Sequence, residues 1–296
     1  MTVSTFTAAE QGRGYLDLMK LRVVELLLVT TVPALVLAEG KLPGLVVTAA
    51  SIIGGTLAAG AANAYNMIIE SDIDKLMART AKRPIVTGVI SRKSAAVFAA
   101  LVGTLSLIIF WVFTTPLATL LALVAIIFYV VVYTMALKQR TAQNIVWGGA
   151  AGCMPVLIGW AAVTNSLSVT PWAFFFVIFF WTPPHFWALA IKYKDDYESA
   201  KIPMLPVVAS QKVVASAMLW HSLAMVVASI ALGFSAKLSM AYVIVATVLG
   251  LAFIYLVGGV RETATLNLEK AAARVFHGSI TYLSLLSLAL TIFALI

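Results

Sequence analysis

Charged residues and cysteine are both scarce in this chain. Only 11% of its 296 residues are charged, whereas soluble domains carry about 25%, so an ordinary soluble domain is excluded. The single cysteine, Cys153, excludes an internal disulfide framework and a cysteine-built metal cage, and its apolar neighbourhood indicates a packing role. No basic tract or basic domain is present, so the net charge of +8 does not point to nucleic acid.

The first twenty residues lack the features of a cleaved leader. They have no basic start followed by an apolar stretch and a cleavage site, and they do not have the arginine- and serine-rich pattern of a transit peptide. The sequence therefore predicts a cytoplasmic N-terminal tail over residues 1–22 and a single transmembrane domain over residues 23–296. A Walker loop and a nucleotide-binding fingerprint are also missing from the sequence, so ATP is not implied.

Apolar residues are abundant, at 62% of the chain. Runs long enough to cross about 30 Å of hydrocarbon cover residues 23–38, 44–69, 94–114, 117–136, 144–163, 171–191, 213–233, 239–258 and 278–296. We therefore expect an all-α, polytopic membrane protein with about nine transmembrane helices.

The lysines and arginines are concentrated in every second connection. Of the twenty, only Lys41 and Lys237 fall in the remaining connections. Because cytoplasmic loops are enriched in these residues, the N-terminus is predicted to be cytoplasmic and the C-terminus external. The positive charge is thus explained by topology.

A first acidic cluster follows the second predicted span. Asn66, Glu70 and Asp74 are spaced four residues apart, so on a helix their side chains point in one direction. An amide oxygen and carboxylates on one face offer the hard oxygen ligands that Mg²⁺ prefers. Arg79 and Arg83 follow directly and could hold the oxygens of a phosphate. The alternative is a solvated loop that caps a membrane helix.

A second acidic loop, with Asp195 and Asp196, follows the sixth predicted span on the same side of the membrane. The paired prolines just before His185 are expected to break or kink this span. His185 and Lys192 are seven residues apart, on roughly one helix face, and an ionisable group near the membrane interior indicates function. The alternative is that His185 bonds a carbonyl and Lys192 extends to the interface. Two acidic clusters interleaved with bases suit a polyanion bridged by metal.

Both loops resemble the paired signature of the UbiA superfamily of intramembrane prenyltransferases, whose first motif is Asn-x-x-x-Asp-x-x-x-Asp. More narrowly, Trp181-Thr-Pro-Pro-His-Phe-Trp-Ala-Leu-Ala, Asp195-Asp-Tyr and Ile202-Pro-Met-Leu-Pro resemble the branch that farnesylates protohaem IX. The resemblance runs from about residue 15 to the C-terminus. Glu70 stands where the wider superfamily usually has aspartate, so a carboxylate is kept. Met67 stands where many relatives carry another acid, so one possible metal ligand is missing.

The resemblance implies that farnesyl diphosphate, haem b and water are converted to haem O and diphosphate, for the maturation of haem-copper terminal oxidases. It implies that Mg²⁺ is held by Asn66, Glu70, Asp74, Asp195 and Asp196. The residues implied to be catalytic are Asn66, Glu70, Asp74, His185 and Lys192. The side chains implied to bind the diphosphate are Arg79, Arg83, Lys138, Arg140, Lys20 and Arg22. Lys20 and Arg22 are equally well explained as ordinary anchors at the membrane interface.

The resemblance also implies a multi-pass protein of the cell membrane whose active site faces the cytoplasm. Its implied partners are the lipid bilayer and a haem A synthase or assembly factors of the terminal oxidase. Aromatic faces of Tyr65, Trp181 and Phe186 would stabilise an allylic cation. His221 and His277 are interpreted as satisfied helix histidines rather than as axial haem ligands.

The role of His185 stays open between three possibilities: contact with haem, acceptance of a proton, and a hydrogen bond to a carbonyl freed by the prolines. Two other functions of the protein also stay open. A secondary transporter of an anionic solute would also use broken spans, but it predicts charges at mid-membrane rather than at the cytoplasmic ends. Prenylation of an aromatic quinone precursor or of chlorophyllide is opposed only by the His185 motif, through the resemblance.

Overall fold

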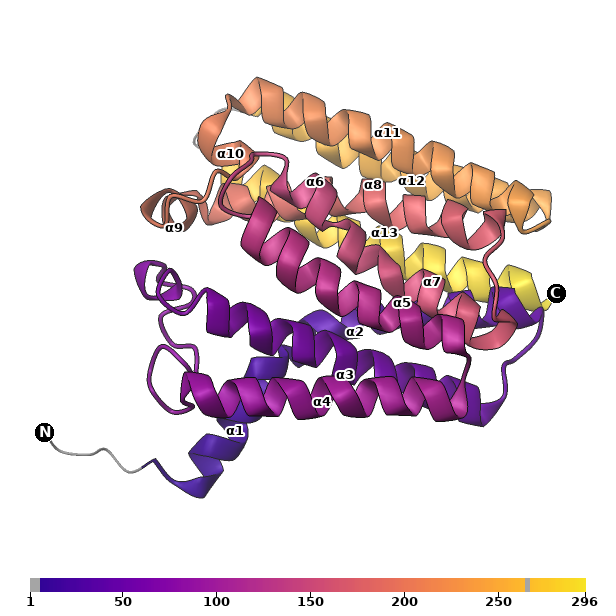
Figure 1. Cartoon of the computed structure of the whole chain (residues 1–296). Coiled ribbons are helices and arrows are strands. Elements are labelled where there is room, and N and C mark those ends of the chain that lie inside the picture. Colours follow the sequence, from indigo (N-terminus) through magenta and orange to yellow (C-terminus); the bar gives the residue numbers. More distant parts are fainter. Residues whose placement is uncertain (1–5, 264–266) are drawn as a thin grey trace, which may run out of the picture.

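The computed structural model describes residues 6–263 and 267–296, apart from the side chains of residues 22, 23, 25–27 and 262. Within these ranges the chain contains no strand and folds into a bundle of long, roughly aligned helices (Figure 1). The expected all-α architecture is therefore confirmed.

Eight helical segments of the described chain are long and apolar enough to cross a membrane. They are α3 (Leu45–Ile69), α4 (Arg92–Phe113), α5 with η2 (Pro116–Ile127 and Phe128–Leu137), α6 with α7 (Asn144–Gly148 and Ala150–Thr164), α8 (Val169–Lys192), α11 (Gln211–Ser235), α12 (Met240–Glu262) and α13 (Leu268–Leu295). The first of the nine expected spans corresponds to α2 (Leu21–Glu39), in which the described residues 28–39 form an apolar helix. A chain with these helices is a multi-pass membrane protein.

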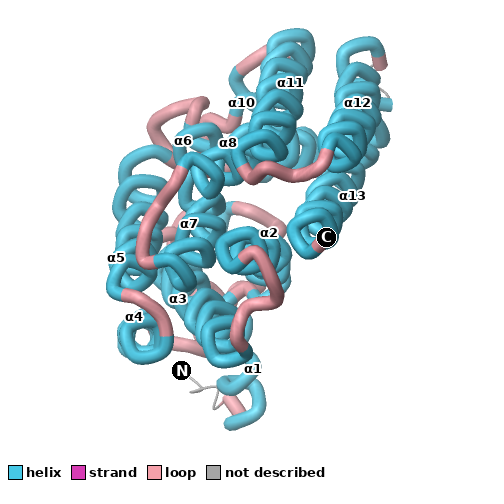
Figure 2. The backbone as a smooth tube through the Cα atoms, turned by 90° about the vertical axis from the view of Figure 1, so that its right-hand side faces the viewer, coloured by secondary structure: helices cyan, strands magenta, loops and turns pink. Residues whose placement is uncertain are grey.

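The long helices form one bundle in which α2 packs against α3, α7 and α13. Seen along the helices, α2, α3 and α7 lie inside and α4, α11 and α12 lie at the margins (Figure 2). The helix α1 (Ala8–Met19) and the C-terminal end of α13 lie at opposite ends of the bundle (Figure 1). This agrees with an odd number of crossings, while the orientation in the membrane stays a prediction.

Short helices gather at the end of the bundle where the two acidic loops were predicted. They are η1 (Asp74–Leu76), α9 (Lys194–Ser199) and α10 (Leu205–Val208) (Figure 1). In the predicted tail, residues 8–19 form α1, whose first turn is closed by a reciprocal capping pair between Thr7 and Glu10. Lys20 then adopts a left-handed backbone conformation (φ 51°) that separates α1 from α2.

Two helices differ from the sequence-based expectation. The last span was predicted to begin at residue 278, but α13 begins at Leu268, because residues 268–274 are strong helix formers although they are not uniformly apolar. A break or kink was predicted at Pro183-Pro184. The break is absent, because α8 runs as one helix from Val169 to Lys192, and the kink stays a prediction. This helix packs against α7, α11 and α13, and such packing supports a helix in which prolines remove backbone donors.

Small residues on α3 allow close helix packing beside the site. A Cβ atom on Gly60 would lie 2.6 Å from the Met19 side chain, and one on Gly54 would lie 2.9 Å from the Phe110 ring. Ser106 of α4 donates a hydrogen bond to the carbonyl of Gly54 at 2.7 Å. Small residues and interhelical hydrogen bonds of this kind hold membrane helices together.

Candidate active site

The predicted cluster of Asn66, Glu70 and Asp74 forms at the end of α3, although not on one continuous helix. The helix ends at Ile69, Glu70 is its cap, and Asp74 begins η1. The N–H of Glu70 nevertheless donates to the carbonyl of Asn66 (2.9 Å), and the N–H of Asp74 donates to that of Glu70 (2.8 Å). The four-residue spacing therefore persists through the turn, and all three residues are at most 2% exposed.

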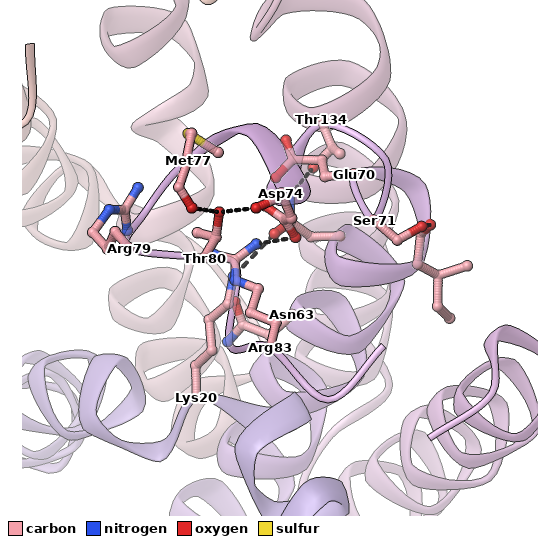
Figure 3. A network of polar contacts seen from close by, with 12 residues as sticks. Lys20, Asn63, Glu70, Ser71, Asp74, Met77, Arg79, Thr80, Arg83 and Thr134 are labelled. Carbon is pink, nitrogen blue, oxygen red and sulfur yellow. Dashed lines mark hydrogen bonds and ion pairs between the residues drawn. The ribbon is translucent and has the colours of Figure 1, made fainter. Parts of the chain in front are cut away.

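Each carboxylate in this cluster is paired with a cation. Lys138, which follows η2, places its Nζ 2.6 Å from Oε1 and 2.7 Å from Oε2 of Glu70. Arg83 places Nη1 2.6 Å from Oδ2 of Asp74 (Figure 3). The acids are at most 2% exposed and the bases are 15% and 16% exposed. Both ion pairs are therefore shielded from water. Arg83 and Lys138, two of the six cations predicted to bind the diphosphate, form these pairs.

Asn66 is held by two hydrogen bonds that fix the direction of its amide. Its Oδ1 accepts from Lys20 Nζ at 2.9 Å, and its Nδ2 donates to Thr134 Oγ1 at 3.3 Å. Thr134 in turn donates to the carbonyl of Tyr129 at 2.9 Å, within the π-helix η2. A π-helix is uncommon and is frequently found at functional sites. Here it brings Thr134 against Asn66.

Asn63, one turn before Asn66, fixes the junction that carries Lys20. Its Nδ2 donates to the carbonyl of Met19 at 3.1 Å, and its Oδ1 accepts from the hydroxyl of Tyr129 at 3.4 Å. Neither Asn63 nor Thr134 is among the site residues predicted from the sequence. The position of Asn63, three residues before Asn66 in an apolar helix, is the signal that could have found it, because a buried amide needs partners.

The cluster contains an excess of positive charge. Burial by itself raises the pKa of Glu70, but the charges of Lys138, Lys20 and Arg83 outweigh it and hold that pKa below its ordinary value. Burial lowers the pKa of Lys20 well below its ordinary value, and repulsion from Arg83 and Lys138 adds to this, while Glu70 and Asp74 oppose it. With Lys20 protonated, three cations surround two carboxylates, and an anion bound there would favour that protonated form.

The donor set also fits Mg²⁺ in part. Oδ1 of Asp74 is buried and has no hydrogen-bond partner among the described residues, and such an atom requires an explanation. No group of three or more His, Cys, Asp or Glu side chains in the described chain is placed to hold a metal ion. Mg²⁺ is commonly held by one or two carboxylates together with the phosphates of a substrate. The site therefore fits an ion that binds together with a phosphate-bearing substrate.

The second acidic loop contacts the first, as predicted. Asp196 accepts hydrogen bonds from the backbone N–H groups of Ala78 and Arg79, at 3.1 and 3.2 Å. Ser199 Oγ donates to the carbonyl of Leu76 at 3.1 Å. These bonds join α9 to the segment that follows η1, so the two loops form one surface. Whether Asp195 and Asp196 bind metal stays a prediction.

An open pocket of about 400 Å³ lies where the two loops meet. It is lined by Ala78, Arg79, Lys192, Tyr193, Asp195 and Asp196. The guanidinium of Arg79 lies 5.4 Å from the ring centre of Tyr193 and 5.7 Å from that of Tyr197. Arg79 points away from the Asp74–Arg83 pair (Figure 3). The predicted cations therefore separate into a buried group and a group at this pocket.

Two predicted cations are not placed in either group. Arg140 is exposed, and it forms no ion pair with any residue whose side chain the structure describes. The side chain of Arg22 lies outside the described part of the structure. Lys192 lines the pocket, with its Nζ 5.5 Å from the ring centre of Tyr193.

His185 is buried in α8, and its Nδ1 shares a hydrogen bond with a serine hydroxyl. Its Nδ1 lies 2.7 Å from Oγ of Ser279, which itself donates to the carbonyl of Phe276 at 2.6 Å. With the single hydroxyl proton of Ser279 used in that bond, Nδ1–H of His185 is the donor and Nε2 carries a lone pair; with the hydroxyl donating to Nδ1 instead, the proton lies on Nε2. The ring stacks between Trp181 and Phe276, at 4.3 and 4.7 Å. The imidazole thus bonds a hydroxyl of α13 and not a carbonyl freed by the prolines.

The other two histidines and the cysteine have ordinary helix contacts. Nδ1 of His221 and of His277 each lies 2.8 Å from the carbonyl four residues earlier. Cys153 is buried, with its Sγ 3.3 Å from the carbonyl of Gly149. These contacts agree with satisfied helix histidines and a packed cysteine, and the roles of the three residues stay predictions. The roles of Tyr65, Trp181 and Phe186 toward a cation stay predictions.

Comparisons with known proteins point to one family. The sequence model of the UbiA prenyltransferase family matches residues 27–280. The chain is 48% identical to a protoheme IX farnesyltransferase of Renibacterium salmoninarum, over 96% of this chain and 90% of the relative. It is also 48% identical to one of Frankia casuarinae, over 97% of this chain and 99% of the relative.

Solved structures of low sequence identity share the fold. A structure described for digeranylgeranylglyceryl phosphate synthase has a TM-score of 0.77 at 16% identity, over 96% of this chain and 99% of the other. A UbiA homolog from Aeropyrum pernix has a TM-score of 0.69 at 22% identity, over 91% and 95%. A UbiA homolog from Archaeoglobus fulgidus bound to DMAPP and Mg²⁺ has a TM-score of 0.68 at 16% identity, over 94% and 98%.

Proposed function

The chain belongs to the UbiA prenyltransferase family, and on that basis we propose that it transfers the farnesyl group of farnesyl diphosphate to haem b. The C1–oxygen bond of the farnesyl diphosphate breaks, and C1 bonds to the terminal carbon of a haem vinyl group. The oxygen of water then adds to the inner vinyl carbon and a proton is released. The products are haem O and diphosphate, and the class of enzyme is a transferase.

The observation that carries this proposal is the buried cluster of Lys20, Arg83 and Lys138. These cations face two carboxylates and one amide at the end of α3, and their excess charge would be neutralised by a departing diphosphate. Stabilisation of a leaving group by fixed charges is strong where water is excluded. Arg79 and Lys192 at the adjoining pocket are proposed to bind the same diphosphate from the second loop.

The same cluster is proposed to hold Mg²⁺. Asn66, Glu70 and Asp74 supply hard oxygen donors, and the unpartnered Oδ1 of Asp74 supports this assignment. Asp195, which is exposed at the pocket, is the candidate from the second loop. When bound, Mg²⁺ would offset the charge of the leaving diphosphate. The solved UbiA homolog from Archaeoglobus fulgidus, whose fold this chain shares, is described as bound to DMAPP and Mg²⁺.

His185 is proposed to act on the haem acceptor. Its Nε2 has no hydrogen-bond partner among the described residues, and the tautomer in which Nδ1–H donates to Ser279 leaves a lone pair on Nε2. A lone pair on Nε2 suits both duties that the sequence leaves open, ligation of the haem iron and acceptance of the proton released when water adds. Both duties need this tautomer.

The setting of the reaction is proposed from charge and topology. The acidic loops lie at one end of the bundle (Figure 1), and the cationic cluster and the pocket adjoin these loops. The distribution of lysine and arginine supports a cytoplasmic location for that end. We propose that the protein resides in the cell membrane and supplies haem O for the maturation of terminal oxidases. A haem A synthase or oxidase assembly factors remain the proposed partners, and no nucleic acid is involved.

One reconstitution tests the proposal. Purified protein in lipid nanodiscs is given haem b, farnesyl diphosphate and Mg²⁺, and the farnesylated haem is measured by its mass. Omitting each component should abolish the product. The Glu198→Gln variant is the matched control, since Glu198 is exposed in the second loop and its carboxylate has no hydrogen bond or ion pair with a described residue. Transfer to an aromatic quinone precursor or chlorophyllide, without transfer to haem b, would contradict the assigned acceptor.

A further inference from the structure

Asp196 differs from the acid beside it in how its carboxylate is used. Asp195 is exposed at the pocket and makes no hydrogen bond with a described residue. Asp196 has both oxygens engaged, Oδ1 with the N–H of Ala78 and Oδ2 with the N–H of Arg79. The two neighbouring acids of the second loop therefore have different surroundings.

The two N–H groups bound by Asp196 come from the start of a tight turn. The carbonyl of Met77 accepts hydrogen bonds from the N–H groups of both Thr80 and Ala81, at 3.1 and 3.0 Å. The N–H groups of Ala78 and Arg79 have no acceptor inside such a turn, as at the start of a helix. Consecutive N–H groups of this kind form a concavity that binds an anion. Asp196, 118 residues further along the chain than Ala78, supplies that anion.

This contact determines where Arg79 lies. Its backbone is held by Asp196, and its guanidinium lies over the rings of Tyr193 and Tyr197, which flank Asp196 in sequence. Nη2 of Arg79 also donates to the hydroxyl of Tyr197 at 3.4 Å. Ser199 adds a second connection between the loops, to Leu76. One short helix, α9, thus holds both the main chain and the side chain of Arg79.

We propose that Asp196 is a positioning residue that holds the Ala78–Arg79 backbone so that Arg79 lines the pocket between the two loops, from which it would bind the diphosphate, and that it is not a ligand of Mg²⁺. The identity of the diphosphate substrate rests on the function proposed above. A carboxylate that turned toward a metal ion would leave two backbone N–H groups without their acceptor. In Asp196→Asn, one N–H group loses its oxygen and the other loses a charged acceptor.

The test compares four variants of the protein in nanodiscs: Asp196→Asn, Asp195→Asn, Glu198→Gln and Ser199→Ala. Each of the first three removes one carboxylate charge from the same loop. The first readout is hydrogen exchange of the backbone amides of Ala78 and Arg79, measured by mass spectrometry. The second is the KM for farnesyl diphosphate, and the third is the Mg²⁺ concentration that gives half the maximal rate.

In Asp196→Asn we expect the two amides to exchange at least about tenfold faster and the KM to rise about tenfold, since hydrogen bonds to a charged group are lost. The Mg²⁺ requirement should stay unchanged. Asp195→Asn should leave amide exchange unchanged, and Glu198→Gln should alter none of the three readouts. Ser199→Ala, which cannot remove a metal ligand, should raise exchange and KM in the same direction by a smaller factor.

Unchanged amide exchange in Asp196→Asn, or a raised Mg²⁺ requirement in that variant, would overturn the proposal. The exchange readout needs no substrate, so it separates this inference from the proposed function. If the unaltered protein failed to farnesylate haem b, the proposed function would be wrong. Faster exchange in Asp196→Asn would then still support the connection between the two loops.

Discussion

The buried pair of Glu70 and Lys138 offers a direct test of how the site is stabilised. It joins the end of α3 to the end of η2, elements 68 residues apart in sequence, with the acid 2% and the base 15% exposed. Removing one partner of a buried pair leaves an uncompensated charge, which costs about 3–5 kcal/mol. Because Lys138 retains some access to water, we expect the lower end of this range, about 3 kcal/mol, for Glu70→Gln.

The double variant Glu70→Gln/Lys138→Met should recover most of this loss. With both charges removed, no buried ion lacks a partner, and such replacements are often neutral or stabilising. We expect the double variant to lie within about 1 kcal/mol of the unaltered protein, which is the typical size of modest substitutions. The single variant Lys138→Met should be destabilised about as much as Glu70→Gln.

The assay is reversible unfolding in mixed micelles by added SDS, followed by the fluorescence of the seven tryptophans. Glu198→Gln, an exposed charge without a partner in the described structure, serves as the control and should shift the free energy of unfolding by less than about 0.5 kcal/mol. If the double variant lost the sum of the two single losses, Glu70 and Lys138 would not act as a pair. Farnesyl transfer should be lost in the double variant even where stability is restored.

Three further predictions concern single side chains. Asp74→Asn should abolish farnesyl transfer while membrane insertion persists, as measured by activity per amount of protein in isolated membranes. The pKa of Lys20 is lowered well below its ordinary value of 10.5 by burial and by repulsion from Arg83 and Lys138. At a pH between the pKa of Lys20 in the folded chain and its pKa in the unfolded chain, the unfolded chain therefore binds more protons. The free energy of unfolding should therefore rise with pH over that interval, and Lys20→Met should remove the rise. In His185→Ala, haem b and farnesyl diphosphate are titrated separately: loss of haem binding alone supports ligation, and intact binding of both with slow turnover supports proton transfer. If binding and turnover both survive, the histidine belongs to the fold.

The spans, and the placement of both acidic loops at the same side of the membrane, could be predicted because they depend on local composition. Apolar length and the distribution of lysine and arginine are properties of each segment by itself. The spacing of Asn66, Glu70 and Asp74 indicated that they act together, and the backbone keeps that spacing beyond the end of α3. A helix that passes through Pro183 and Pro184 could not be predicted, since its support comes from neighbouring helices.

The partners within the site depend on contacts between distant segments. Lys20 reaches Asn66 only because the backbone turns left-handed between α1 and α2, and the sequence had explained it equally well as an interface anchor. Thr134 reaches Asn66 from a π-helix, which has no sequence signature of its own. The use of both Asp196 oxygens for backbone N–H groups is likewise a long-range contact.

The pairing of opposite charges within the cluster also determines how substrate and metal should bind. Glu70 contacts Lys138 and Asp74 contacts Arg83, so a diphosphate alone would draw the cations away and leave buried carboxylates unpaired. Mg²⁺ alone would leave the cations unpaired. Arriving together, the two replace both partners at once, and we expect Mg²⁺ to tighten farnesyl diphosphate binding at least about tenfold, a coupling of about 1.4 kcal/mol. Calorimetric titration with and without Mg²⁺ measures this coupling, and equal affinities in the two titrations would show that the ion pairs persist when the substrate binds.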